Sequence, residues 1–279
     1  MLAQRVITAI VLLAILVFAL SVQSKWPLLI FMSLTVAAAA YEWIKLTLPN
    51  RQSLAWMISV AILALTLYQG WLWQVEPPAI WSIWHVCVTL TAVMWLLIIP
   101  TFTLLVKSTK PLQSWALFAP ICLFATWGVL GLTWIQSGAW PLISLLTIVW
   151  IADIFAYFGG RQFGRHKLAP TISPGKTREG ALIGIAGVVL WMLVSSQWAG
   201  SYAADVLNQW GFLGLVLVGG LLGSVSVLGD LYESLLKRCA GVKDSGRLLP
   251  GHGGVYDRVD AVLAVVPVAF LLVSDFWYR

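Results

Sequence analysis

Residues 83–106 read IWHVCVTLTAVMWLLIIPTFTLLV and contain no Asp, Glu, Lys or Arg. A helix needs about 20 predominantly apolar residues to cross the hydrocarbon core of a bilayer, so this stretch predicts a membrane-spanning helix. Similar apolar stretches lie on both sides of it, near 6–22, 27–44, 54–73, 115–135, 141–158, 181–199, 211–229 and 259–277. The sequence therefore predicts an all-α, polytopic integral membrane protein with about nine transmembrane helices.

The composition of the whole chain points the same way. Of its 279 residues, 60% are hydrophobic and 10% are charged, and the mean hydropathy is +0.90. Soluble domains carry roughly 25% charged residues, so a water-soluble globule is excluded. The three cysteines are far apart and lack the spacing of a zinc site or a disulfide framework. No repeat or low-complexity linker divides the chain, so we expect one transmembrane domain, 1–279.

The basic residues predict the orientation of the helices. With nine spans and a cytoplasmic N-terminus, every Lys and Arg except Lys25 and Arg279 falls on the inside. The positive-inside rule favours this arrangement, and a miscounted helix would scramble it. The acids are concentrated in the second half, near two long inside loops at about 159–180 and 231–258. We therefore expect 1–140 to be mainly scaffold and 141–279 to be the catalytic half.

The first inside loop reads GGRQFGRHKLAPTISPGKTREG over 159–180. Its glycines, cations and hydroxyl groups are suited to surrounding phosphates with backbone N–H groups and positive charge. Gly175-Lys176-Thr177 does not belong to a P-loop, because Pro170 occupies the position of the first glycine and we expect no preceding strand. The alternative is that these cations only set the topology and touch anionic headgroups.

The second inside loop, together with the start of the last helix, reads LYESLLKRCAGVKDSGRLLPGHGGVYDRVD over 231–260. Asp257 and Asp260 are three residues apart, so both carboxylates can lie on one side of a helical turn. Asp230, which we expect at the end of the preceding helix, could face them, and Asp153 is a further contributor. Carboxylates gathered near substrate phosphates are typical of Mg²⁺ sites. Alternatively, these acids neutralise nearby Lys and Arg or cap helices.

Two single residues have open interpretations. His252 lies in a Pro-Gly-His-Gly-Gly turn, where it contacts a ligand or serves as a structural hydrogen-bonding group. Glu42 lies inside the second apolar stretch, where an unpaired charge costs at least about 2.5 kcal/mol. It should therefore have a structural partner or form part of a site wall.

The residues of the second loop resemble the signature of the phosphatidate cytidylyltransferases, also called CDP-diglyceride synthetases. The matching positions are Ser234, Lys237, Arg238, Lys243, Asp244, Gly246, Leu249, Pro250, His252, Gly253, Gly254, Val255, Asp257, Arg258, Val259 and Asp260. The stretch from Asp153 to Gly180 is also similar to that family. The resemblance thus covers both inside loops and, through length and helix number, most of the chain.

The resemblance implies transfer of the cytidylyl group of CTP to phosphatidate, which gives CDP-diacylglycerol and pyrophosphate in phospholipid biosynthesis. It implies Mg²⁺ as cofactor and permits a second, monovalent cation. We expect a bacterial inner membrane, with an organellar membrane as the alternative, and an active site on the cytoplasmic side, where both polar loops fall. CTP and membrane phosphatidate are the expected partners, with no nucleic acid, and a homodimer through the first half is a family-level expectation.

Each candidate residue has an expected role. The expected catalytic residues are Asp230, Lys237, Arg238, Lys243, Asp244, Asp257 and Arg258. The expected substrate-binding residues are Arg161, Ser173, Lys176, Thr177, Glu179, His252, Gly253 and Gly254. The expected metal ligands are Asp230 and Asp257 first, with Asp153, Asp244 and Asp260 as further contributors. Two other functions stay open at this point, namely an anion transporter or channel, and a membrane lipid kinase or phosphatase.

Overall fold

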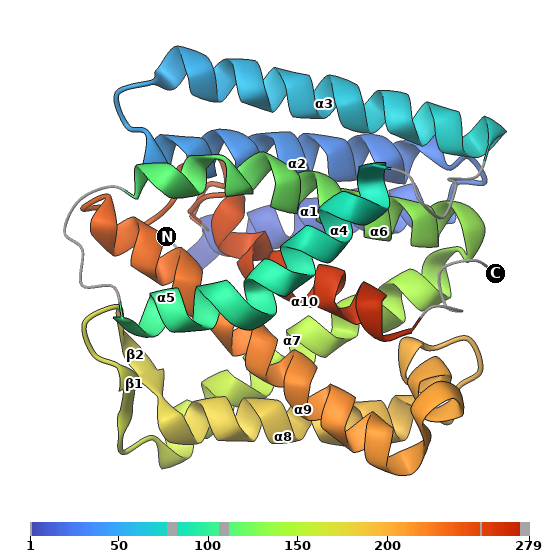
Figure 1. Ribbon diagram of the computed structural model, residues 1–279, viewed down its shortest axis with the longest axis vertical. Helices are drawn as coiled ribbons and strands as arrows, with labels where there is room; N and C mark the ends of the chain where they lie inside the picture. The colour runs from blue at the N-terminus through green and yellow to red at the C-terminus, as the bar shows by residue number, and fades with distance from the viewer. Residues whose placement is uncertain (1, 77–82, 106–111, 252, 274–279) are drawn as a thin grey trace. The chain divides into compact units, whose positions relative to one another are not determined.

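The computed structural model describes residues 2–76, 83–105, 112–251 and 253–273 (Figure 1). Helices dominate these residues. Their bounds are α1 (Leu2–Ser21), α2 (Trp26–Thr47), α3 (Gln52–Val75), α4 (Ile83–Val93), η1 (Met94–Ile98), α5 (Ile99–Leu105), η2 (Gln113–Ala116), α6 (Phe118–Gln136), α7 (Ala139–Phe163), α8 (Arg178–Ser195), α9 (Tyr202–Cys239) and α10 (Tyr256–Leu272). Each predicted apolar stretch falls mainly on one helix or on one consecutive run of this series. The prediction of an all-α polytopic fold is thus confirmed.

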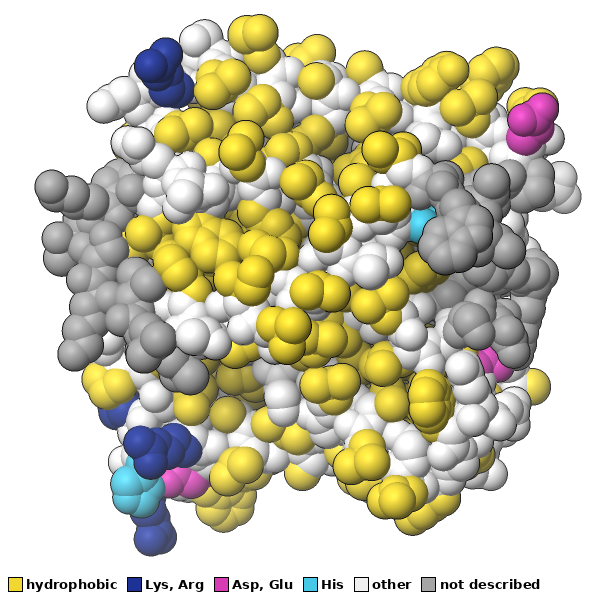
Figure 2. Space-filling model, in the orientation of Figure 1, with side chains coloured by type: hydrophobic (Ala, Val, Ile, Leu, Met, Phe, Trp, Pro, Cys, Tyr) yellow, Lys and Arg dark blue, Asp and Glu magenta, His cyan; other side chains and the backbone are white. Residues whose placement is uncertain are grey.

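Seven helical segments within the described ranges are long and apolar enough to cross a membrane. They are Trp26–Thr47, Gln52–Val75, Ile83–Thr103, Gln113–Gln136, Ala139–Phe163, Arg178–Ser195 and Tyr202–Cys239. Large hydrophobic side chains such as Trp56, Met57, Leu213 and Leu217 are exposed. Figure 2 shows hydrophobic side chains over much of the visible face. The chain is an integral membrane protein, whereas the count of about nine crossings and the inside N-terminus stay predictions.

The fourth apolar stretch is a single helical run with a π-helical turn in its middle. At the end of η1 the Ile99 N–H donates to the carbonyl of Met94, five residues earlier. Pro100 follows directly, and a proline ring collides with the carbonyl four residues before it in a regular α-helix. A wider π turn next to a proline is a known way for a helix to accommodate that ring. The helix therefore continues through Pro100 without ending.

The longest helix, α9, is interrupted near its start. Gly211 has φ 68° and ψ −174°, so the helical path is broken at this residue. A positive φ of this size is unfavourable for a residue with a Cβ, which explains the glycine. The helix then runs on to Cys239, about two turns beyond Asp230. Asp230 therefore lies inside a helix and not at its end, contrary to the expectation from the sequence.

The polar loop after α7 forms a small hairpin. Its strands are β1 (Lys167–Ala169) and β2 (Ser173–Thr177), which pair antiparallel with Lys167 opposite Thr177 and Ala169 opposite Ser173. β1 precedes Gly175-Lys176-Thr177, which itself lies in β2, so the expectation that no strand precedes these residues is wrong. The other argument against a P-loop still holds, because Pro170 occupies the place of its first glycine.

The chain divides into two compact units, and neither is a continuous segment. Unit 1 comprises Met1–Cys87, Lys107–Gly131 and Leu236–Val259, and unit 2 comprises Val88–Val106, Leu132–Leu235 and Asp260–Arg279. The expected division into a scaffold half and a catalytic half does not follow these units. Unit 1 contains α2 together with the loop after α9.

Unit 1 is packed through aromatic rings. The Trp73 ring stacks on Trp127 at 5.7 Å and meets Trp84 edge-on at 5.1 Å. Trp43 of α2 stacks on Tyr256 at the start of α10, with ring centroids 4.8 Å apart. Trp43, Trp84, Trp127 and Tyr256 are all fully buried. Such ring pairs contribute about 0.5–1.5 kcal/mol beyond the area they bury, so the Trp43 pair holds the start of α10 against α2.

Unit 2 contains a close pair of helices, α7 and α8. A Cβ added at Gly184 would lie 2.9 Å from the carbonyl oxygen of Ala152 and 3.0 Å from the Cβ of Ala156. Small residues in membrane helices let two backbones approach closely, and this contact requires glycine. The close approach brings the end of α7 and the start of α8 together, and both ends line the cavity described next.

Candidate active site

A cavity of about 460 Å³ opens in unit 2 between α7, β2, α8 and α9. Its apolar wall includes Ala152, Ala156 and Ala181. Its polar and charged lining residues are Asp153 and Arg161 of α7, Lys176 and Thr177 of β2, and Ser226 and Asp230 of α9. Four of the expected binding or catalytic residues therefore line one cavity, together with Asp153.

Lys176 and Asp230 form an ion pair across this cavity. Their side chains are 25% and 38% exposed, so the pair is only partly desolvated. The half-buried Asp260 of α10 interacts electrostatically with Asp230, Lys176 and Asp153. Asp230 and Asp153 thus both add negative charge beside Asp260, and Lys176 offsets part of it. This arrangement favours a bound cation that would reduce their repulsion.

In the part of the chain that the structure describes, side chains alone do not form a metal site. Within the described ranges, no group of three or more His, Cys, Asp or Glu side chains is placed to hold one ion. Magnesium is usually bound through one or two carboxylates, with substrate phosphates and water completing its shell. Asp153 and Asp230 supply hard oxygen ligands of this kind at the cavity wall. The residues therefore fit a magnesium ion that arrives with a phosphorylated substrate.

The loop that carries Lys176 is held by the first turn of α8. The Thr177 hydroxyl caps this helix by accepting from the Gly180 N–H at 3.1 Å. The Glu179 carboxylate accepts from the backbone N–H groups of Arg165, at 3.0 Å, and His166, at 3.1 Å. It also lies 2.6 Å from the His166 ring Nδ1. Glu179 therefore holds the basic loop in place through hydrogen bonds to Arg165 and His166.

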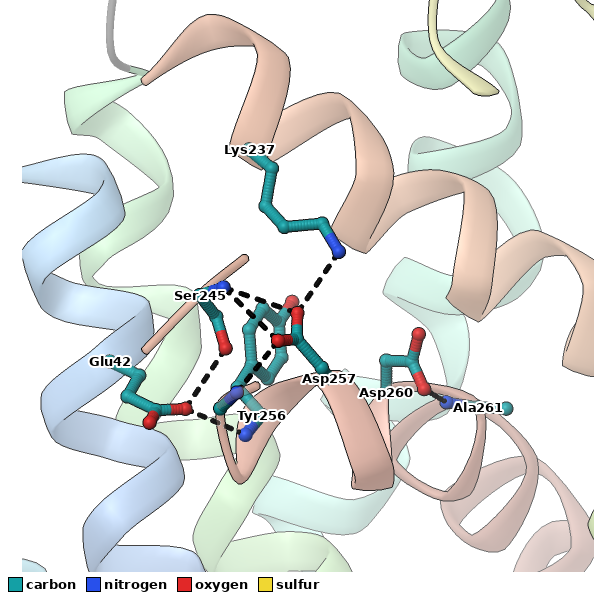
Figure 3. Close-up of polar contacts among 8 residues, drawn as sticks. Glu42, Lys237, Ser245, Tyr256, Asp257, Asp260 and Ala261 are labelled. Carbon is teal, nitrogen blue, oxygen red and sulfur yellow. Dashed lines mark hydrogen bonds and ion pairs between the residues drawn. The ribbon is translucent and has the colours of Figure 1, made fainter. Parts of the chain in front are cut away.

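A second cluster lies in unit 1, around Asp257 in the first turn of α10. Its Oδ1 accepts from Lys237 Nζ at 3.0 Å, and its Oδ2 accepts from the Gly254 N–H at 2.8 Å (Figure 3). The Ser245 N–H lies 3.2 Å from both oxygens. The Lys237 and Asp257 side chains are 14% and 8% exposed. Both oxygens of Asp257 are thus used to hold the loop between α9 and α10.

Asp257 and Asp260 have separate surroundings although they lie one turn apart. In Figure 3 the Asp257 carboxylate points toward Ser245 and Lys237. The Asp260 carboxylate lies beside the backbone N–H of Ala261, at 2.8 Å. The two carboxylates therefore have different hydrogen-bond partners, and their expected shared role at a metal ion stays a prediction. A spacing of three residues spreads two side chains by about 60° around a helix, which is enough to give them different neighbours.

Glu42 of α2 also belongs to the unit 1 cluster, although it lies far outside the signature residues. Its Oε2 accepts from the Ser245 hydroxyl at 3.0 Å and from the Tyr256 N–H at 2.8 Å. The residue is 2% exposed. The only sign in the sequence was an acid inside an apolar stretch, and its partner Ser245 is 203 residues away.

Comparison with known proteins identifies the family. A family model described as "Cytidylyltransferase family" matches residues 3–276. The chain belongs to this family. It is 35% identical to the phosphatidate cytidylyltransferase of Pseudomonas aeruginosa over 99% of both chains. It is 42% identical to the Haemophilus influenzae phosphatidate cytidylyltransferase over 47% of this chain and 44% of that protein, and 42% identical to the Helicobacter pylori one over 53% and 50%.

The family match confirms the resemblance drawn from the two loops. This protein is a membrane-embedded cytidylyltransferase, and therefore a nucleotidyltransferase. The transporter and the lipid kinase or phosphatase, which the sequence left open, lose their support. The alternative for the first loop was that its cations only set the topology and touch anionic headgroups. The cavity that Arg161, Lys176 and Thr177 line weakens this alternative.

The other predicted residues of the cytidylyltransferase are not among those that line the cavity. Lys243, Asp244 and Arg258 in unit 1 are exposed, as is Arg238 on α9. Gly253 has φ 87°, and a Cβ there would lie 2.8 Å from Asp257 Oδ2. Ser173 is half-buried in β2, where it pairs with Ala169. His252 lies outside the described residues, so its role stays a prediction, as do the metal roles of Asp244 and Asp257.

Proposed function

We propose that this enzyme transfers the cytidylyl group of CTP to phosphatidate and releases pyrophosphate. The observation that carries the proposal is the cavity of unit 2, where Arg161 and Lys176 lie with Asp153 and Asp230 in a membrane protein of this family. The relatives that are matched are named for the same reaction. Cations suit the phosphates of both substrates, and carboxylates suit the magnesium that accompanies a nucleoside triphosphate.

Cytidylyl transfer to phosphatidate does not need a strong general base. The phosphomonoester of phosphatidate has a second pKa of about 6, so it is largely ionised near neutral pH. One of its oxygens forms a bond to the α-phosphorus of CTP while the α–β anhydride bond breaks, and pyrophosphate leaves with that bridging oxygen. The residues of the chain then have two tasks, which are to align two polyanions and to offset charge.

Specific residues are suited to these tasks. Lys176 and Arg161 provide cationic N–H donors at the cavity, and the Thr177 side chain lies at the same wall. Asp153 and Asp230 would hold Mg²⁺, with Asp260 adding negative charge beside them. When bound, Mg²⁺ supplies positive charge to phosphate oxygens as negative charge develops on them. In unit 1, Lys237, Lys243 and Arg258 are the cations that the signature assigns to the reaction.

We place the active site on the cytoplasmic side of a bacterial inner membrane. This proposal is supported by the bacterial origin of the relatives and by the inside location that the positive-inside rule gives both polar loops. CTP is soluble and phosphatidate lies in the bilayer, so the two substrates must meet at such an interface. The second, monovalent cation, the homodimer and the lack of a nucleic-acid partner stay predictions from the resemblance.

The first prediction concerns the reaction itself. Purified protein in detergent should release pyrophosphate from CTP only when both Mg²⁺ and phosphatidate are present. The measurement is pyrophosphate release with each component omitted in turn, together with mass spectrometry of the lipid product. Release without lipid, or no release from folded protein across several acyl-chain lengths, would contradict the proposed function.

The second prediction concerns Lys176. Lys176→Ala should raise the apparent KM for CTP or for phosphatidate by about 10- to 100-fold, because a charge-assisted contact to phosphate is lost. The measurement is a pair of saturation curves, one for each substrate. Lys45→Ala is the matched control, since Lys45 is exposed on α2 and lies outside the cavity lining. Unchanged KM values for both substrates would show that Lys176 binds neither of them.

A further inference from the structure

The loop between α9 and α10 has little backbone structure of its own. It carries the signature residues Lys243, Asp244 and Gly254. Within its described part, the backbone pairing is one isolated bridge, between Leu249 and Gly253. Backbone hydrogen bonds tie its first residues to the end of α9, and the rest of the described loop is held mainly by side-chain contacts. Those contacts therefore decide where the signature residues are held.

Two buried carboxylates supply these contacts from opposite sides of Ser245. The Ser245 hydroxyl donates to Glu42 Oε2 at 3.0 Å, and the Ser245 N–H lies 3.2 Å from both oxygens of Asp257 (Figure 3). Asp257 in turn accepts from Lys237 Nζ at 3.0 Å. A continuous chain of hydrogen bonds therefore runs from α2, through the loop, to α9.

The surroundings of Glu42 are built closely around its carboxylate. Its Oε2 also accepts from the Tyr256 N–H, and the neighbouring Trp43 stacks on the Tyr256 ring. A Cβ added at Gly246 would collide with Glu42 Oε1, and one added at Gly254 would collide with Glu42 Oε2 and with Ser245 Oγ. Signature positions 246 and 254 must therefore be glycine to let the loop backbone approach this carboxylate.

A carboxylate inside a membrane helix carries a large free-energy cost, so its presence at position 42 indicates a functional role. An acid inside a membrane helix costs about 2.5–3.5 kcal/mol, and such residues mark functional sites by default. An apolar side chain of similar size would avoid this cost but would leave the Ser245 hydroxyl and the Tyr256 N–H without their acceptor. Glu42 supplies a fixed acceptor for these two donors, which an apolar side chain cannot do.

We propose that Glu42 is a positioning residue for cytidylyl transfer. Through Ser245 and the Tyr256 N–H it fixes the 243–257 loop in the shape that presents the signature residues to the substrates. Glu42 itself touches neither substrate. This inference rests on the proposed function, and it extends the active site to α2, in the part of the chain expected to be scaffold.

Four variants test this role. Glu42→Ala removes the acceptor, whereas Glu42→Gln keeps a carbonyl oxygen able to accept from both donors. Ser245→Ala removes one hydrogen bond of the chain while leaving Glu42 in place. Glu76→Gln is the matched control, because Glu76 is an exposed acid following α3. The readouts are kcat/KM of the folded, monodisperse fraction, the thermal midpoint, and amide hydrogen exchange over 243–257.

The expected pattern separates positioning from a general contribution to folding. Glu42→Ala should lower kcat/KM by about 100-fold, since a misplacement of about 1 Å costs that much. Glu42→Gln should recover activity to within about tenfold of the unchanged enzyme, the value of one hydrogen bond. Ser245→Ala should lower kcat/KM by about tenfold while the protein still folds, because one buried hydrogen bond of the loop is lost. Glu76→Gln should match the unchanged enzyme.

Several outcomes overturn the inference. Full specific activity in both Glu42→Ala and Ser245→Ala would do so, and so would a Glu42→Gln enzyme as impaired as Glu42→Ala. If Glu42→Ala does not fold, full specific activity in Ser245→Ala is enough to overturn the inference.

Hydrogen exchange separates this inference from the proposed function. If the unchanged protein shows no lipid-dependent pyrophosphate release, the proposed function fails and exchange alone decides on the loop. Amides of 243–257 should then exchange at least about tenfold faster in Glu42→Ala, or in Ser245→Ala if the first variant does not fold. Unchanged exchange rates over this loop would refute positioning by Glu42.

Discussion

Asp230→Asn should lower kcat by at least about 100-fold while the protein still folds. Asp230 lines the cavity of unit 2, pairs with Lys176 and interacts electrostatically with Asp260. Its removal takes away one of the two carboxylates at the cavity wall that fit a magnesium ion. It also leaves Lys176 without its anionic partner. Because asparagine has nearly the same shape as aspartate, the packing around α9 should stay intact.

The measurement is kcat as a function of Mg²⁺ concentration. Asp230→Asn should move the curve to higher Mg²⁺, because a neutral amide is a weaker ligand for a hard cation. Asp230→Glu keeps the charge and serves as the comparison of shape. Glu76→Gln controls for the loss of any one acid. Near-normal turnover in Asp230→Asn at ordinary Mg²⁺ would remove this residue from the metal site.

Asp257→Asn should also lower kcat/KM by at least about 100-fold, for a different reason. The Asp257 carboxylate accepts from Lys237 and from the N–H groups of Ser245 and Gly254, and the whole group is nearly buried. An asparagine turns one acceptor oxygen into an N–H donor facing other donors. Removing one partner of a buried ion pair costs about 3–5 kcal/mol, because the remaining charge stays buried. The loop should therefore lose its shape.

The thermal midpoint and the Mg²⁺ dependence together identify what Asp257 does. A role in holding the loop predicts a lower thermal midpoint and faster amide exchange over 243–257, with an unshifted Mg²⁺ curve. A role as metal ligand, which the signature suggested, predicts an unchanged midpoint and a shifted curve. Lys237→Met tests the partner, and it should reproduce the loss of thermal stability. An Asp257→Asn enzyme with normal stability and normal turnover would contradict both roles.

Much of the cavity could be predicted because its residues are close in the sequence or belong to regular helices. The first loop contains Arg161, Lys176 and Thr177, and the capping of α8 by Thr177 is a local contact between neighbours. The strand that carries Lys176 was missed because β2 exists only through its pairing with β1, and the Ser-Pro-Gly sequence is a poor strand former.

Asp257 and Asp260 have different interaction partners, which their spacing in the sequence could not predict. Asp257 and Asp260 differ by one helical turn, yet one holds the loop with Lys237 while the other acts on Asp230 and Lys176. The position of a side chain around a helix follows from its periodicity, but its partner depends on which element packs there. That information lies in the tertiary structure.

The sequence by itself determined that the protein is helical and embedded in a membrane, since burial of long apolar stretches in lipid is a local property of each stretch. It also determined the family and its reaction, because the signature residues are clustered in the chain. The hydrogen bond from Ser245 to Glu42 joins residues 203 positions apart and was decided by the tertiary structure alone. No local pattern encodes such a partner, because it exists only where folding brings α2 against the loop before α10 and removes both groups from water.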